Sequence, residues 1–106
     1  MRFDLELVRD VLLDIEELHQ PPERMNFSEP QDFNRASKYP IEKLVYHMRL
    51  LDQADYIEWA PTFAGGDILY YSSINGLTYT GHQFLETIRQ PLIWRQTKDK
   101  ASALHP

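Results

Sequence analysis

The stretch that decides the fold is YPIEKLVYHMRLLDQADYIEW, residues 39–59. Pro40 suits the first turn of a helix, and the apolar residues after it recur at spacings of three and four. They are Ile41, Leu44, Met48 and Leu51. This period predicts an amphipathic helix over residues 41–54 whose aliphatic stripe faces a core. The segment turns extended and aromatic at Tyr56, so we expect the helix to pass directly into a β-strand.

Two extended runs follow this helix, YIEWAPTF (56–63) and DILYYSSI (67–74). Both are rich in the β-branched and aromatic residues that pleated strands favour. Between them lie Ala64, Gly65 and Gly66, and adjacent glycines can supply the positive φ angles that a tight hairpin turn requires. The sequence therefore predicts a β-hairpin immediately after the helix.

The flanking segments predict further helices. FDLELVRDVLLDIEEL (3–18) has the helical period, and Pro21 and Pro22 end it. The polar stretch 20–32 reads as a loop with a short strand around Met25–Phe27, and residues 30–37 as a short helix. After the hairpin, Thr78 or Thr80 is expected to cap a helix that ends near residue 90, and the tail 92–104 is helix-prone and basic.

The order of these elements indicates a fold class. A helix that runs directly into a two-stranded hairpin is the order of a winged helix-turn-helix, in which that helix lies in the DNA major groove and the hairpin is the wing. A length of 106 residues suits one domain. We therefore predict a single α+β domain over residues 1–106, a winged helix-turn-helix with a two-stranded wing and additional C-terminal helices.

The composition indicates the class of protein and the compartment in which we expect it. Hydrophobic residues make up 42% and charged residues 25% of the chain, as in ordinary globular proteins. The chain has no cysteine, which excludes disulfides and thiolate metal sites and fits a reducing compartment, so we expect a cytoplasmic protein. No apolar run approaches the roughly 18 residues of a membrane span, so no membrane partner is expected.

The net charge of −5 argues against a nucleic-acid partner, because phosphate contacts need lysine and arginine. The charge is unevenly distributed, however. Residues 1–30 hold three basic and eight acidic side chains, whereas residues 31–106 hold eight of each. In residues 89–106 one aspartate accompanies four basic side chains, Arg89, Arg95, Lys98 and Lys100. The chain is acidic at its start and basic at its end.

Three pieces of the sequence carry a resemblance: DLELVRDVLLDIEE (4–17), YHMRLLDQADYIE (46–58) and LTYTGHQFLETIRQPLIWRQTK (77–98). On these pieces the chain resembles an uncharacterised bacterial and phage-associated family, a domain of unknown function expected to be winged-helix. The resemblance implies that fold and a phage or mobile-element setting. It implies no activity and supplies no catalytic residues.

The middle piece also looks like the joint between helix and wing in bacterial winged-helix regulators, where L..AGLI is common. This chain has LDQADYI, with Asp55 where glycine is usual. Aspartate tolerates the left-handed backbone conformation better than most residues. We therefore expect the joint to be kept.

These observations lead to a first hypothesis, a dimeric DNA-binding protein that regulates phage or prophage transcription, with double-stranded DNA as its partner. The helix would present Lys43, Tyr46, Arg49 and Gln53. Arginine and glutamine read base edges, and lysine holds phosphate. Further phosphate contacts would come from Arg89, Arg95, Lys98 and Lys100.

An alternative hypothesis is a protein-interaction module without DNA contact, which binds a partner protein or a second copy of itself. The first helix is acidic, and the hairpin tip PTFAGGD carries no basic residue. Tyr46 and Leu50 could form a small apolar patch on the central helix.

Enzymatic chemistry is not expected. His47 and His82 stand thirty-five residues apart without a ligand motif, so we expect no metal ligand, cofactor or catalytic residue. His82 is expected at a helix start, where Gly81 allows close approach of a neighbouring element. Asp10, Asp14 and Glu17 are expected to form a solvated helix face.

Overall fold

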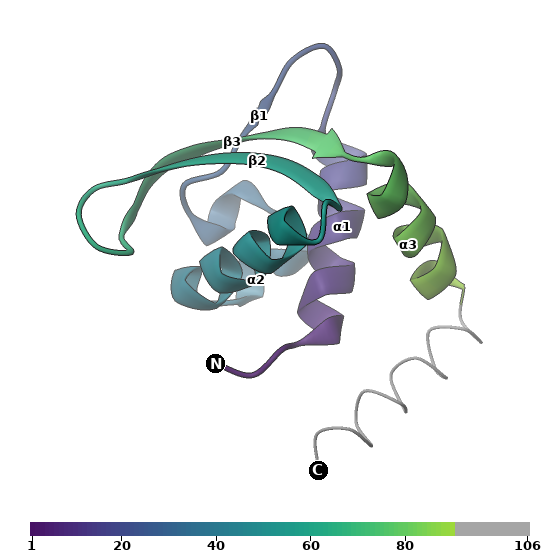
Figure 1. Cartoon of the computed structure of the whole chain (residues 1–106), viewed down its shortest axis with the longest axis horizontal. Coiled ribbons are helices and arrows are strands. Elements are labelled where there is room, and N and C mark those ends of the chain that lie inside the picture. The colour runs from purple at the N-terminus through teal and green to yellow at the C-terminus, as the bar shows by residue number, and fades with distance from the viewer. Residues whose placement is uncertain (91–106) are drawn as a thin grey trace.

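The computed structural model describes residues 1–90 (Figure 1). Three helices and three strands form a mixed α+β fold, as the sequence predicts in outline. In chain order the elements are α1 (Leu5–Leu18), β1 (Met25–Asn26), two 3-10 turns (Pro30–Asp32 and Arg35–Lys38), α2 (Ile41–Gln53), β2 (Ile57–Phe63), β3 (Leu69–Leu77) and α3 (Tyr79–Arg89). The predicted short helix over 30–37 is thus replaced by two separate turns.

The sheet is antiparallel with the strand order β1-β3-β2. The hairpin prediction is confirmed, and the tip is closed by a hydrogen bond from the Ala64 amide to the Ile68 carbonyl at 2.8 Å. Gly65 and Gly66 have φ angles of 88° and 56°, as the turn requires. The short strand predicted near Met25 is also present, and it pairs with the far side of β3.

One core lies between the sheet and the helices, and in Figure 1 the sheet arches over α1 and α2. The predicted aliphatic stripe of α2 is largely confirmed, because Leu44, Met48 and Leu51 are buried and Ile41 lies half-buried at the edge. Val45, which the stripe did not include, is buried as well.

The joint between α2 and β2 is a Schellman motif centred on Asp55. Asp55 has a φ of 63°, the left-handed conformation predicted for it. The Tyr56 amide donates to the Leu51 carbonyl at 2.9 Å and the Asp55 amide to the Asp52 carbonyl at 3.0 Å. These two hydrogen bonds satisfy carbonyls at the helix end and turn the chain directly into the hairpin.

The base of the hairpin and the start of α3 meet this joint. Thr78 caps α3 by accepting from the Gly81 amide at 3.0 Å, and the hydroxyls of Thr78 and Thr80 donate to the Asp55 carbonyl at 2.5 and 2.7 Å. Gly81 passes so close to Tyr56 that an added Cβ would lie 2.0 Å from the Tyr56 carbonyl oxygen. The expected close approach at Gly81 is therefore confirmed.

The expectation of a solvated acidic face on α1 is wrong for two of its three carboxylates. Asp14 is fully buried, and Asp10 is 7% exposed. Asp10 accepts a hydrogen bond from the Tyr39 hydroxyl at 3.0 Å, and burial together with this carboxylate raises the pKa of Tyr39. Only Glu17 lies at the surface, where it pairs with Arg35 at 2.8 Å.

The buried carboxylate of Asp14 holds the second 3-10 turn against α1. It accepts from the backbone amides of Asn34, Arg35 and Ala36 at 3.1, 3.1 and 2.9 Å. The spacing of acidic residues along α1 could not show this, because the turn that covers them lies about twenty residues further along the chain.

Candidate interaction site

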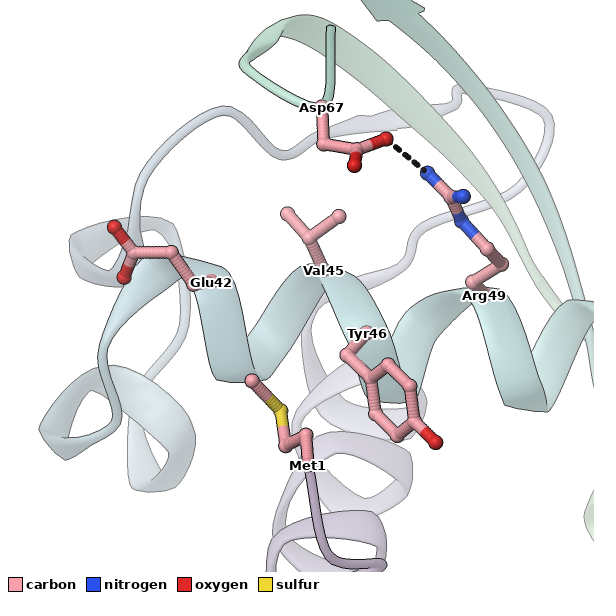
Figure 2. Close-up of a pocket in the computed structure, with 6 residues that line it drawn as sticks. All are labelled: Met1, Glu42, Val45, Tyr46, Arg49 and Asp67. Atoms are coloured by element: carbon pink, nitrogen blue, oxygen red, sulfur yellow. Dashed lines mark ion pairs between the residues drawn. The ribbon is translucent and has the colours of Figure 1, made fainter.

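A cavity of about 400 Å³ lies between the exposed side of α2 and the curled tip of the hairpin (Figure 2). It combines one helix, the hairpin tip and the start of the chain. Its lining residues are Met1, Glu42, Val45, Tyr46, Arg49 and Asp67. Its volume falls in the range of pockets that bind small ligands or single side chains of a partner.

The inner part of the cavity is apolar. Val45 is 6% exposed and Tyr46 is 38% exposed. In Figure 2 the Met1 side chain lies beside α2 close to Tyr46. Because apolar surface gains by leaving water, this part favours an apolar group.

The rim of the cavity is charged. Arg49 and Asp67 form an ion pair across the opening at 3.7 Å, with side chains 45% and 90% exposed (Figure 2). An exposed pair at this separation contributes little to stability. The Arg49 guanidinium also lies 5.2 Å from the centre of the Phe63 ring, so two residues of the hairpin, Phe63 and Asp67, contact it.

His47, next to the cavity on α2, has a structural role. It is fully buried; its Nε2 accepts from the Asp4 amide at 2.9 Å, and its Nδ1 donates to the Lys43 carbonyl at 2.8 Å. This pairing requires the neutral ring with its proton on Nδ1, and burial lowers the pKa of His47. The Nε2 atom thus holds the segment before α1 on α2, and the Nδ1 atom is engaged within α2.

The four predicted contact residues of α2 lie in different environments. The amine of Lys43 pairs with Asp4 at 2.8 Å. Tyr46 and Arg49 line the cavity, and Gln53 is exposed at the end of the helix. The structure therefore brings Tyr46 and Arg49 together, and it turns Lys43 toward the start of the chain.

The predicted phosphate contacts at the end of the chain are described only in part. Arg89 pairs with Glu16 of α1 at 2.5 Å and with Glu86 at 3.2 Å, so two carboxylates already neutralise it. Arg95, Lys98 and Lys100 lie outside the described residues.

The segment that forms α2 and the hairpin carries more acidic than basic side chains. Residues 41–77 contain five acidic and two basic side chains. Contacts to phosphate groups depend on lysine and arginine.

His82 lies at the start of α3 and is exposed, with its backbone amide bonded to the Thr78 carbonyl at 2.9 Å. Within residues 1–90, no three His, Cys, Asp or Glu side chains are grouped so as to hold a metal ion. None of the helices in this part of the chain combines the length and apolar character that crossing a membrane requires.

Sequence reasoning missed Met1, Val45 and Asp67 as parts of the site. The sequence offers only a weak signal for the hairpin tip, the apolar residues Ile68 and Tyr70 that follow Asp67. In the structure these two side chains are 69% and 72% exposed. They adjoin the lining residue Asp67 in the chain but do not themselves line the cavity.

Comparison with curated proteins gave no match, and comparison with solved structures gave none. A family model described as "Hypothetical protein (DUF2513)" matches residues 2–105. Because that match spans nearly the whole sequence, the chain belongs to the DUF2513 family of hypothetical proteins.

Proposed function

We propose that this chain is a winged-helix domain that acts as a protein-interaction module through the surface formed by α2 and the hairpin. The observation that carries the proposal is the apolar cavity on the exposed side of α2, which has an acidic surround. In a DNA-reading winged helix this side of the helix presents cations to the major groove. Here it presents a hollow that fits a side chain.

The order of elements supports the winged-helix part of the proposal. An early short strand, a helix and then a hairpin follow one another along the chain. The return strand of the hairpin pairs with both other strands, in the order β1-β3-β2. Winged helices share this arrangement, in which the hairpin extends beside the second main helix.

In-cell photo-crosslinking tests the interaction module. A photoreactive phenylalanine analogue replaces Tyr46 at the cavity or, as the matched control, Tyr79, which is 77% exposed on α3. We expect a discrete protein adduct from position 46 and none from position 79. The proposal is wrong if position 46 gives no protein adduct or gives the same adducts as position 79.

A second candidate function is DNA binding by a phage or prophage regulator, which the element order favours. It would use Arg49 and Gln53 on α2 together with the basic residues near the chain end. A gel-shift assay with random duplex DNA at about 50 mM salt tests it, because electrostatic contacts are strong there. A salt-sensitive shift that Arg49→Ala weakens would support DNA binding, and no shift would reject it.

A further inference from the structure

We infer that the cavity takes a bulky apolar side chain of a partner peptide in which lysine or arginine flanks that side chain. The inference rests on the proposed interaction module and names the chemistry of its partner. It is argued from the interior of the cavity, from the charges at its rim and from the surface beside it.

The interior selects for an apolar group. Its contact surface is built by Val45, by the ring of Tyr46 and by Met1. Met1 is 66% and Tyr46 is 38% exposed, so a partner side chain that entered the cavity would remove apolar surface of both residues from water. A tryptophan, phenylalanine or leucine side chain offers the most apolar area for such a contact.

The rim selects for a cation. Two carboxylates, Glu42 and Asp67, line the cavity together with one guanidinium, Arg49. The pair of Asp67 with Arg49 has a separation of 3.7 Å, longer than the 2.7–2.9 Å of a strong charged hydrogen bond. Glu42 has no ion-pair partner among residues 1–90. A cation of the partner would therefore meet the carboxylate of Glu42, whereas an anion would meet only Arg49, which already pairs with Asp67.

The hairpin tip that carries the lining residue Asp67 has further exposed apolar side chains. Ile68 and Tyr70 follow Asp67 in the chain and are 69% and 72% exposed. A peptide that extends beyond the cavity along the hairpin can contact them, whereas a small ligand that fills only the cavity cannot.

The test measures binding of three labelled heptapeptides to the full chain by fluorescence anisotropy at about 50 mM salt, where charge contacts are weakly screened. The first has a central tryptophan flanked by arginine and lysine in a glycine–serine background. The second has two glutamates as the flanking residues, and the third has serine in place of tryptophan. We expect the first to bind about tenfold more tightly than either of the others.

Two pairs of variants locate the binding. Tyr46→Ala should weaken the first peptide about tenfold, whereas Tyr79→Ala should leave it unchanged. Glu42→Lys should weaken it about fivefold and improve the glutamate peptide. Glu23→Lys makes the same charge change at an exposed loop position and should alter neither by more than about twofold.

Four results would overturn the inference. If both tryptophan peptides bind equally and both lose affinity in Tyr46→Ala, the cavity is an interaction site without a preference for cations. If the cationic peptide binds equally well to Tyr46→Ala, the net negative charge of the protein attracts it and the cavity does not. If no peptide binds at about 1 mM, the inference fails and crosslinking alone decides the interaction module. If the chain self-associates in sedimentation and Tyr46→Ala abolishes this, the occupant is a second copy.

Discussion

Removing the buried carboxylate of Asp14 should detach the second 3-10 turn from α1 and destabilise the whole domain. This side chain is inaccessible to water and accepts hydrogen bonds from three consecutive backbone amides, those of residues 34, 35 and 36. Arg35 adds a side-chain contact at 3.2 Å. The predicted perturbations are Asp14→Ala, which removes every acceptor, and Asp14→Asn, which keeps one oxygen.

The magnitude follows from these contacts. Hydrogen bonds to a charged group contribute about 1.5–3 kcal/mol each, so three of them sum to about 5–9 kcal/mol if the amides stay buried. The turn can instead open and let its amides reach water, which limits the loss. We therefore expect Asp14→Ala to lower the free energy of unfolding by about 3–5 kcal/mol, the range for breaking a buried charged network, and Asp14→Asn by about 2–3 kcal/mol.

Urea denaturation followed by circular dichroism measures the effect. With a slope of about 1.5 kcal/mol per molar, Asp14→Ala should lower the midpoint by about 2–3 M. The matched control is Glu17→Gln, which removes a carboxylate three residues away that pairs with the same Arg35. Because that pair is exposed, the control should leave the midpoint nearly unchanged. Equal losses for Asp14→Asn and Glu17→Gln would refute the reasoning.

Three further outcomes follow from the fold. Gly81→Ala should destabilise the domain by more than about 2 kcal/mol, because the added Cβ would lie 2.0 Å from the Tyr56 carbonyl oxygen. The control Gly65→Ala meets only open space but requires alanine to adopt a φ of 88°, and it should cost about 1 kcal/mol. Thermal denaturation compares the two variants. Thr78→Ala should cost about 1 kcal/mol by removing the cap of α3, and Thr78→Ser, which keeps the acceptor, should restore most of it. Burial lowers the pKa of His47 from its usual value of 6.5, so below pH 6.5 the unfolded chain binds more protons than the folded chain. Stability should therefore be full above pH 6.5 and fall as the pH drops below it, and His47→Gln should reduce this slope in denaturation curves between pH 7.5 and about 5.5; an unchanged slope would contradict the assignment.

Local signals in the sequence were sufficient for the parts of the fold in which neighbouring residues determine the conformation. The helical period located α2, and the paired glycines located the hairpin tip. Asp55, a residue type that tolerates positive φ, located the joint between α2 and the hairpin. The cap at Thr78 follows from the same kind of short-range chemistry. These features depend on contacts within a few residues.

Features that depend on distant contacts were not predictable. The burial of Asp14 requires knowing that residues 34–36 fold onto α1. Likewise, the pairing of Met25 with Ile74 joins segments that no local pattern connects. Carboxylates at helical spacing predict a solvent-exposed helix face, but here a turn that is distant in the sequence covers Asp10 and Asp14.

The candidate site was predictable only in part. Tyr46 and Arg49 were placed correctly on the outer side of α2 by periodicity. They form one cavity with Asp67 only because the hairpin curves toward the helix. Met1 reaches the same cavity because His47 anchors the backbone at Asp4. Neither is encoded in spacing along the chain.

The hairpin is fixed by hydrogen bonds at its base, whereas the two glycines at its tip face open space, and this difference determines where the chain can change in length. At the base, the Thr78 amide and two hydroxyls converge on the carbonyls of Asp55 and Tyr56, so an extra residue there would rotate α3 away from its seat. At the tip, Gly65 and Gly66 have no neighbour within 4 Å of an added Cβ. Insertions in related chains should therefore accumulate at Gly65 and Gly66, and an epitope or label grafted there should leave the helices and the base of the hairpin intact.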